Sequence, residues 1–205
     1  MRVLLQRISA KRNLYDCKIR VNEKEIYKAM GEIRLIKPAI EYDDDIMMFR
    51  KEILETNGPD SFAGCYSLKL CETADKWVES CVAMENIETC PENFVTSTTY
   101  MAVRTSDNRV VGIMELRHHI NHPILGTWGG HIGYSVRPSE RGNGYAKEML
   151  RLCLQRCKER SMDKVMVTCS TENAASEKTI LANGGIFEKT VPGDGEVMKR
   201  YWITL

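Results

Sequence analysis

The sequence predicts a mixed α/β domain in which helices flank a central mixed sheet. Segments with alternating apolar residues, typical of half-buried strands, interleave with segments whose apolar residues recur at helical spacing. Strands of the first half follow one another through a turn, whereas a later helix joins two strands. With 205 residues, 43% of them apolar, the chain is long enough for one domain with a sizeable core.

The first half is expected to supply a strand, two helices and a group of antiparallel strands. Acidic residues crowd the first turn of the first helix, where negative charge suits the helix dipole. The segment SDNR separates two apolar, alternating stretches and therefore indicates a hairpin. The expected ranges are strand 31–37, helix 41–58, loop 59–71, helix 72–86, strands 96–104 and 110–119, loop 121–130 and strand 131–138.

The second half contains the helix that joins two strands. Its apolar residues recur at helical spacing from Ala146 to Cys157, so one face is expected to pack on a sheet. The apolar stretch 164–169 then indicates a buried strand parallel to the one before the helix. A helix at about 174–183 and a final strand pair around the turn PGDG complete the order.

The N-terminal segment 1–30 differs in charge from the rest of the chain. It carries a net charge of +5, whereas the whole chain has a net charge of only +1. We expect it to be a basic extension that precedes one folded domain over 31–205. The alternative is that this arm adds a strand and a helix to the domain.

Composition argues against several classes of protein. A net charge of +1 and a pI of about 7.5 give no indication that the chain binds nucleic acid or an anionic membrane. No apolar run reaches the roughly 18 residues of a membrane helix, and the first residues lack a signal-peptide core. The eight cysteines include no Cys-x-x-Cys pair and are expected to be reduced. Together these features favour a cytoplasmic protein.

The segment SERGNGYAKEML, residues 139–150, predicts an anion site where a helix begins. Backbone amides at a helix start lack intrahelical acceptors and carry the positive end of the dipole. Gly142 and Gly144 leave room for a ligand to approach them. The spacing does not fit a P-loop, nor the glycine fingerprint of dinucleotide-binding folds. It fits Arg-x-x-Gly-x-Ala, filled by Arg141, Gly144 and Ala146.

This segment resembles the acetyl-CoA motif of the GNAT superfamily of N-acetyltransferases. A second block, Asn173-Ala-Ala-Ser176 followed by Gly185-Ile-Phe187, is similar to the superfamily's downstream motif, and the resemblance covers about residues 31–205. It implies a pyrophosphate held by backbone amides and a pantetheine arm paired with a strand. For Asn173 and Ser176 the alternative is helix capping alone. The residues implied to bind the coenzyme are Tyr134, Ser135, Val136, Arg141, Gly142, Asn143, Gly144, Tyr145, Ala146, Asn173 and Ser176.

The resemblance implies that an amine attacks the acetyl thioester directly, which requires a base. Glu115 and His118, on the strand GIMELRHH, are the candidate bases, with a solvated carboxylate and an uninvolved loop histidine as the alternatives. Ile180 stands where relatives often carry the tyrosine that protonates the departing thiolate. Tyr201 or Tyr145 is the candidate substitute, unless the thiolate leaves unaided.

The implied function is acetyl-CoA-dependent acetylation of a primary amine on a small molecule or, as a weaker expectation, a peptide. The alternative is a non-catalytic acyl-CoA-binding module, suggested by Ile180. No metal is expected, because neighbouring histidines at 118 and 119 point to opposite faces of a strand and no carboxylate or cysteine completes a ligand set. No nucleic-acid or membrane partner is expected; a homodimer is left open.

Overall fold

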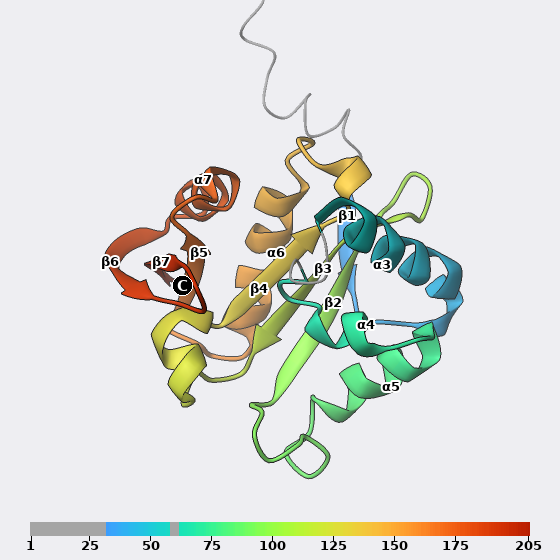
Figure 1. The fold of residues 1–205 in the computed structure, drawn as a ribbon, viewed down its shortest axis with the longest axis horizontal. Helices are drawn as coiled ribbons and strands as arrows, with labels where there is room; N and C mark the ends of the chain where they lie inside the picture. The colour runs from blue at the N-terminus through green and yellow to red at the C-terminus, as the bar shows by residue number, and fades with distance from the viewer. Residues whose placement is uncertain (1–31, 58–61) are drawn as a thin grey trace, which may run out of the picture. The chain divides into compact units, whose positions relative to one another are not determined.

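The computed structural model describes residues 32–57 and 62–205, and Ile33–Leu205 form one compact unit. The predicted extension 1–30 and the end of the first helix at Gly58 lie outside the described residues. Within them, seven strands form two antiparallel sheets (Figure 1). No helix of these two ranges is long and apolar enough to cross a membrane.

The larger sheet has four strands in the order β1-β2-β3-β4, and each neighbouring pair is antiparallel. One face packs against the helices that follow β1, around the fully buried Phe49, Trp77 and Ile113. The other face packs against α6, around Met114 and Met149. The elements are β1 (Ile33–Ile36), α3 (Asp43–Asn57), α4 (Tyr66–Leu70), α5 (Ala74–Ala83), β2 (Ser97–Arg104), β3 (Val110–Arg117), β4 (Ile132–Val136) and α6 (Tyr145–Glu159).

The smaller sheet has three strands in the order β5-β7-β6, and α7 lies beside it (Figure 1). Antiparallel pairing of β5 with β7 runs from Lys164–Thr204 to Ser170–Met198. Its buried side chains, among them Val167 and Tyr201, join the α6-side core. The elements are β5 (Lys164–Ser170), α7 (Ala174–Ala182), β6 (Ile186–Pro192) and β7 (Val197–Thr204).

The predicted fold class is confirmed, and each predicted strand and helix of the described residues is present within a few residues of its expected range. Three details differ. The expected loop 59–71 contains the short helix α4, and the loop 121–130 contains a π-helical turn, Leu125–Gly129. The strand after α6 does not continue the first sheet but begins the second, so the central sheet is divided between β4 and β5.

Candidate active site

Strands β4 and β5 are joined at one point and separate beyond it. The His131 N–H donates to the Met166 carbonyl at 2.8 Å, and the Met166 N–H donates to His131 Nδ1 at 2.9 Å. Further along β4, the hydroxyls of Tyr134 and Ser176 lie 2.8 Å apart, although Ser176 follows the end of β5. Both strands therefore leave the joint in the same direction. We call residues 132–136 of β4 and 166–170 of β5 the fork.

Backbone groups of β4 face into the fork. Arg137, which follows β4, donates its N–H to the Val111 carbonyl on β3 at 2.9 Å. Because residues bonded to a neighbour alternate along an antiparallel strand, the N–H and C=O of Tyr134 and Val136 point away from β3. Arg141 Nε donates to the Val136 carbonyl at 3.3 Å. An extended chain with amide groups is the natural partner for such a strand edge.

The segment 141–144, which we call the cradle, connects a turn after β4 to α6. Gly142 and Gly144 have φ values of 82° and 75°, in the left-handed region that favours glycine. A β-carbon at Gly142 would have no heavy atom within 4 Å, so this backbone is open to approach. Asn143 Nδ2 donates to the Glu140 carbonyl at 3.2 Å. The amides that open α6 are therefore presented at an uncovered helix start, as an anion requires.

The start of α7 carries the second predicted coenzyme contact. Asn173 Oδ1 accepts the Ser176 N–H at 2.9 Å and thereby caps the helix. A carboxamide keeps two N–H donors while its oxygen caps, so capping and ligand binding are compatible. Burial raises the pKa of the Tyr134 phenol, which contacts Ser176, to about 12, so it stays a protonated donor.

Glu115 lies on β3 directly opposite Gly133 of β4. Its neighbours Met114 and Leu116 pack on the α6 side, so Glu115 faces the α3–α5 layer, as the alternation predicts. Glu115 Oε1 accepts from Ser97 Oγ at 2.8 Å, and Oε2 pairs with Arg117 Nη2 at 2.9 Å. The carboxylate is thus held in place rather than free in solvent.

Residues 62–65, which precede α4, cover β4 on the same face as Glu115. A β-carbon at Gly64 would lie 2.1 Å from the Gly133 carbonyl oxygen, so the two backbones touch, and Gly64 has a φ of 74°. Ser135 Oγ donates to the Ala63 carbonyl at 2.8 Å. This segment therefore packs on β4 at the level of Glu115 and can form one wall of an acceptor site.

His118 does not join Glu115. Two residues beyond Leu116, it falls on the α6 side, and its ring nitrogens lie 2.9 Å from Thr98 Oγ1 and 3.0 Å from Thr96 Oγ1. Burial lowers the pKa of His118 to about 4. Both ring nitrogens are engaged, and the ring lies on the opposite face of the sheet from Glu115. It is therefore not placed to act on the same substrate as Glu115.

The hydroxyl of Tyr201 is also engaged by a neighbouring side chain. Its side chain is only 1% exposed, and its hydroxyl donates to Glu177 Oε1 at 2.6 Å. Burial and the Glu177 carboxylate raise the pKa of Tyr201. Ile180 is fully buried in the same core and has no proton to give. Neither position supplies an acid with a free hydroxyl.

Three features of the site were not found from the sequence. Arg117 shares a face with Glu115, and the two-residue spacing on a strand could have indicated the pair. Ser97 and Gly64 gave no signal, since both reach the site through contacts between segments distant in the chain.

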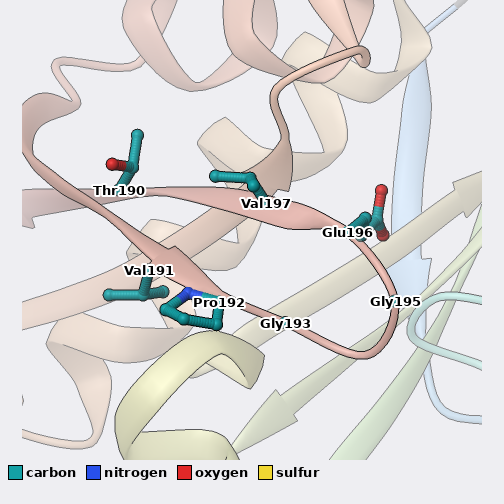
Figure 2. Close-up of a pocket in the computed structure, with 7 residues that line it drawn as sticks. All are labelled: Thr190, Val191, Pro192, Gly193, Gly195, Glu196 and Val197. Carbon is teal, nitrogen blue, oxygen red and sulfur yellow. The ribbon is translucent and has the colours of Figure 1, made fainter.

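Neither a metal-binding cluster nor a surface concavity adds to the site formed by these residues in the described part of the chain. Within residues 32–57 and 62–205, no group of three His, Cys, Asp or Glu side chains is placed to hold a metal ion. A shallow concavity of about 450 Å³ lies at the β6–β7 turn and contains no predicted site residue (Figure 2); it is lined by Thr190, Val191, Pro192, Gly193, Gly195, Glu196 and Val197.

Comparisons with known proteins identify the family and agree with the fold. A family model described as an acetyltransferase (GNAT) domain matches residues 34–186, which include β4, the cradle and α7. No curated protein sequence matches. Similar solved structures include Mycobacterium smegmatis RimJ in complex with CoA-disulfide, with 17% identity, TM-score 0.62, and 85% of this chain and 83% of that one covered.

Two further structures are similar over most of their length. One is the microcin C7 self-immunity acetyltransferase MccE with acetyl-CoA and AMP: 16% identity, TM-score 0.59, and 85% of this chain and 93% of that one covered. The other is a Salmonella typhimurium acetyltransferase that modifies the N-terminal serine of ribosomal protein L7/L12: 14% identity, TM-score 0.57, and 84% and 95% covered.

Proposed function

The chain belongs to the acetyltransferase (GNAT) domain family, whose model spans residues 34–186, and from this premise we propose that it acetylates a primary amine with acetyl-CoA. The observation that carries the proposal is the arrangement of one continuous segment. Residues 132–146 supply both a strand edge that faces a fork and an uncovered helix start. An extended thioester arm ending in a pyrophosphate needs both.

The residues present fit this co-substrate. The amides of residues 142–146 would hold the pyrophosphate, with Gly142 leaving the approach open, whereas the Arg141 N–H donates to the Pro138 carbonyl at 3.3 Å. The backbone of Tyr134 and Val136 would pair with the two amides of the pantetheine arm, and Ser135 anchors that strand to the Ala63 carbonyl. Acetyl-CoA supplies an acyl group activated as a thioester.

Glu115 is the base that this arrangement favours. An amine with a pKa of about 10 is mostly protonated at neutral pH and must lose a proton before it attacks. Glu115 pairs with Gly133 of β4 and lies on the sheet face that the segment containing Gly64 covers. There it can accept that proton directly or through water. Arg117 and Ser97 fix the carboxylate in one orientation. A backbone N–H of β4 at the fork would polarise the carbonyl under attack.

For the acceptor we propose a small-molecule primary amine. The second candidate is the α-amine of a protein N-terminus, favoured by the Salmonella typhimurium neighbour that modifies the N-terminal serine of a ribosomal protein. Both acceptors present the same nucleophile, and they differ in whether the rest of the substrate is compact or an extended chain.

The test is release of free CoA thiol from acetyl-CoA in the presence of two panels, one of small amines and one of short peptides with free N-termini. Acetylation in the first panel supports the proposal, and acetylation confined to peptides supports the second candidate. Binding of acetyl-CoA without thiol release from either panel would favour the non-catalytic binding module. Absence of acetyl-CoA binding would refute the proposal.

A further inference from the structure

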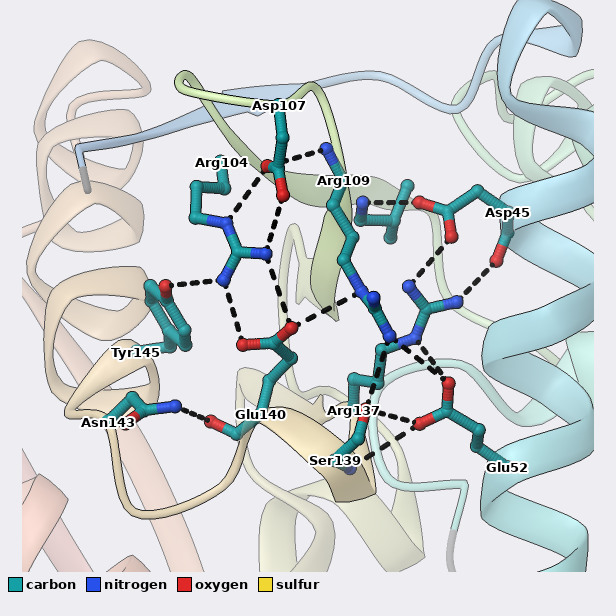
Figure 3. Close-up of polar contacts among 11 residues, drawn as sticks. Asp45, Glu52, Arg104, Asp107, Arg109, Arg137, Ser139, Glu140, Asn143 and Tyr145 are labelled. Carbon is teal, nitrogen blue, oxygen red and sulfur yellow. Dashed lines mark hydrogen bonds and ion pairs between the residues drawn. The ribbon is translucent and has the colours of Figure 1, made fainter. Parts of the chain in front are cut away.

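The guanidinium of Arg104, at the end of β2, has every N–H engaged. It donates to Asp107 at 2.9 and 2.7 Å and to the Glu140 carboxylate at 2.8 and 3.3 Å. The remaining donor meets the Tyr145 hydroxyl at 3.1 Å (Figure 3). A guanidinium has five N–H donors in a rigid plane, so these contacts fix the relative positions of all three partners.

Two of those partners are the residues on either side of the cradle. Glu140 directly precedes Arg141, and Tyr145 directly follows Gly144 as the first residue of α6. Between them lie two glycines in left-handed conformations, and a glycine backbone can adopt more conformations than that of any other residue type. We propose that Arg104 is a positioning residue that holds both ends of the cradle so that its amides are preorganised for the pyrophosphate. This inference rests on the proposed function.

Further ion pairs tie the turn before the cradle to the rest of the domain. Arg109 Nε lies 3.2 Å from Glu140 Oε1, so that carboxylate is held from two sides (Figure 3). The Ser139 hydroxyl donates to Glu52 on α3 at 2.7 Å. Arg137, which is fully buried, pairs with Asp45 at 2.7 Å and with Glu52 at 3.1 Å. The cradle is thus supported by α3 and by the β2–β3 hairpin.

The charge of this network argues that its effect is geometric. Four carboxylates and three guanidiniums meet beneath the cradle, which leaves a net charge of −1. A negative network does not attract a pyrophosphate, so any gain in affinity must come from holding the amides in place. The members are Asp45, Glu52, Asp107 and Glu140 with Arg104, Arg109 and Arg137.

The two explanations predict opposite signs for Glu140→Gln. This change removes one negative charge beside the cradle, so a purely electrostatic network would bind CoA more tightly after it. If positioning dominates, the dissociation constant for CoA rises about tenfold, as expected when only about a tenth of the molecules keep a formed cradle. Arg104→Lys, which keeps the charge but loses the planar fork, is expected to weaken CoA binding to a similar extent.

A matched control and a second ligand separate positioning from general damage. Glu159→Gln makes the same chemical change in an exposed pair with Arg156 at the other end of α6 and should leave CoA affinity unchanged. Pantetheine lacks the pyrophosphate, so its affinity should change little in Glu140→Gln and Arg104→Lys. Equal losses for both ligands, or unchanged or tighter CoA binding, would overturn the inference.

Hydrogen exchange of the amides 141–146 supplies a readout that needs no ligand. It should be faster in Glu140→Gln and Arg104→Lys than in the wild type, and unchanged exchange would contradict the role of Arg104. If these variants fail to fold, Tyr145→Phe removes a single hydroxyl contact and should raise the CoA dissociation constant about threefold. If the wild type does not bind CoA, the proposed function fails, while the exchange rates still decide whether Arg104 positions the cradle.

Discussion

Gly142→Ala should show whether CoA binding needs the open space beside the cradle, because its effect on CoA affinity can be compared with its effect on the stability of the fold. Gly142 has a φ of 82°, and a β-carbon there would meet no heavy atom within 4 Å. The substitution therefore adds no clash, and only the left-handed backbone opposes it, at about 1–2 kcal/mol. Reduced freedom of the unfolded chain offsets about 0.4–1 kcal/mol of that. We expect a net destabilisation of about 1 kcal/mol, or a fall in Tm of about 2–4 °C.

The effect on CoA should be larger than the effect on stability. The added methyl group would occupy the open side from which a pyrophosphate reaches the amides, so we expect the dissociation constant to rise more than about tenfold, measured by titration calorimetry. Gly195→Ala is the matched control, because Gly195 has a φ of 75° and the same empty surroundings but lies in the β6–β7 turn. Similar CoA affinities for the two variants would refute the placement of the pyrophosphate at the cradle.

Three further predictions follow from the contacts of the site. Glu115→Gln should lower kcat/KM about 100-fold without changing the affinity for CoA, and full retention of kcat/KM would exclude Glu115 as the base. Gly64→Ala should lower the free energy of unfolding by at least about 2 kcal/mol, because its β-carbon would lie 2.1 Å from the Gly133 oxygen; urea unfolding measures this, and a wild-type midpoint would contradict the close packing. Burial lowers the pKa of His131 to about 4, below that of the unfolded chain, so stability should fall as the pH drops from about 6.5 toward 4. We expect a lower urea midpoint at pH 5 than at pH 7, and a smaller difference between the two midpoints in His131→Asn. An unchanged difference would assign the pH dependence to other groups.

The sequence predicts the order of elements well, because its apolar residues follow strand and helix periods. It does not reveal where β5 pairs. A buried apolar strand after a crossover helix is expected beside the preceding strand, yet β5 pairs with β7 over its full length and meets β4 at one point. The pairing of β5 depends on β7, which lies many residues later in the chain, so no local sequence pattern indicates it.

The sequence indicates the geometry of the site where that geometry depends on the backbone of one segment, and not where it depends on the partners of a side chain. The left-handed backbone of the cradle could be expected because Gly142 and Gly144 stand in the sequence itself. The hydrogen-bond partners of His118 and Tyr201 could not, since Thr96, Thr98 and Glu177 are distant from them in sequence.

The fork itself depends on a side chain in place of a backbone group. The His131 carbonyl points toward β3, where it accepts the Arg117 N–H at 2.8 Å, and so it is turned away from β5. The ring Nδ1 accepts the Met166 N–H instead, at 2.9 Å. An imidazole accepts only at an unprotonated nitrogen, so the joint requires the neutral ring, which agrees with its lowered pKa. Protonation of His131 would remove this acceptor, and the joint between the two sheets is therefore a part of the fold that we expect acid to weaken.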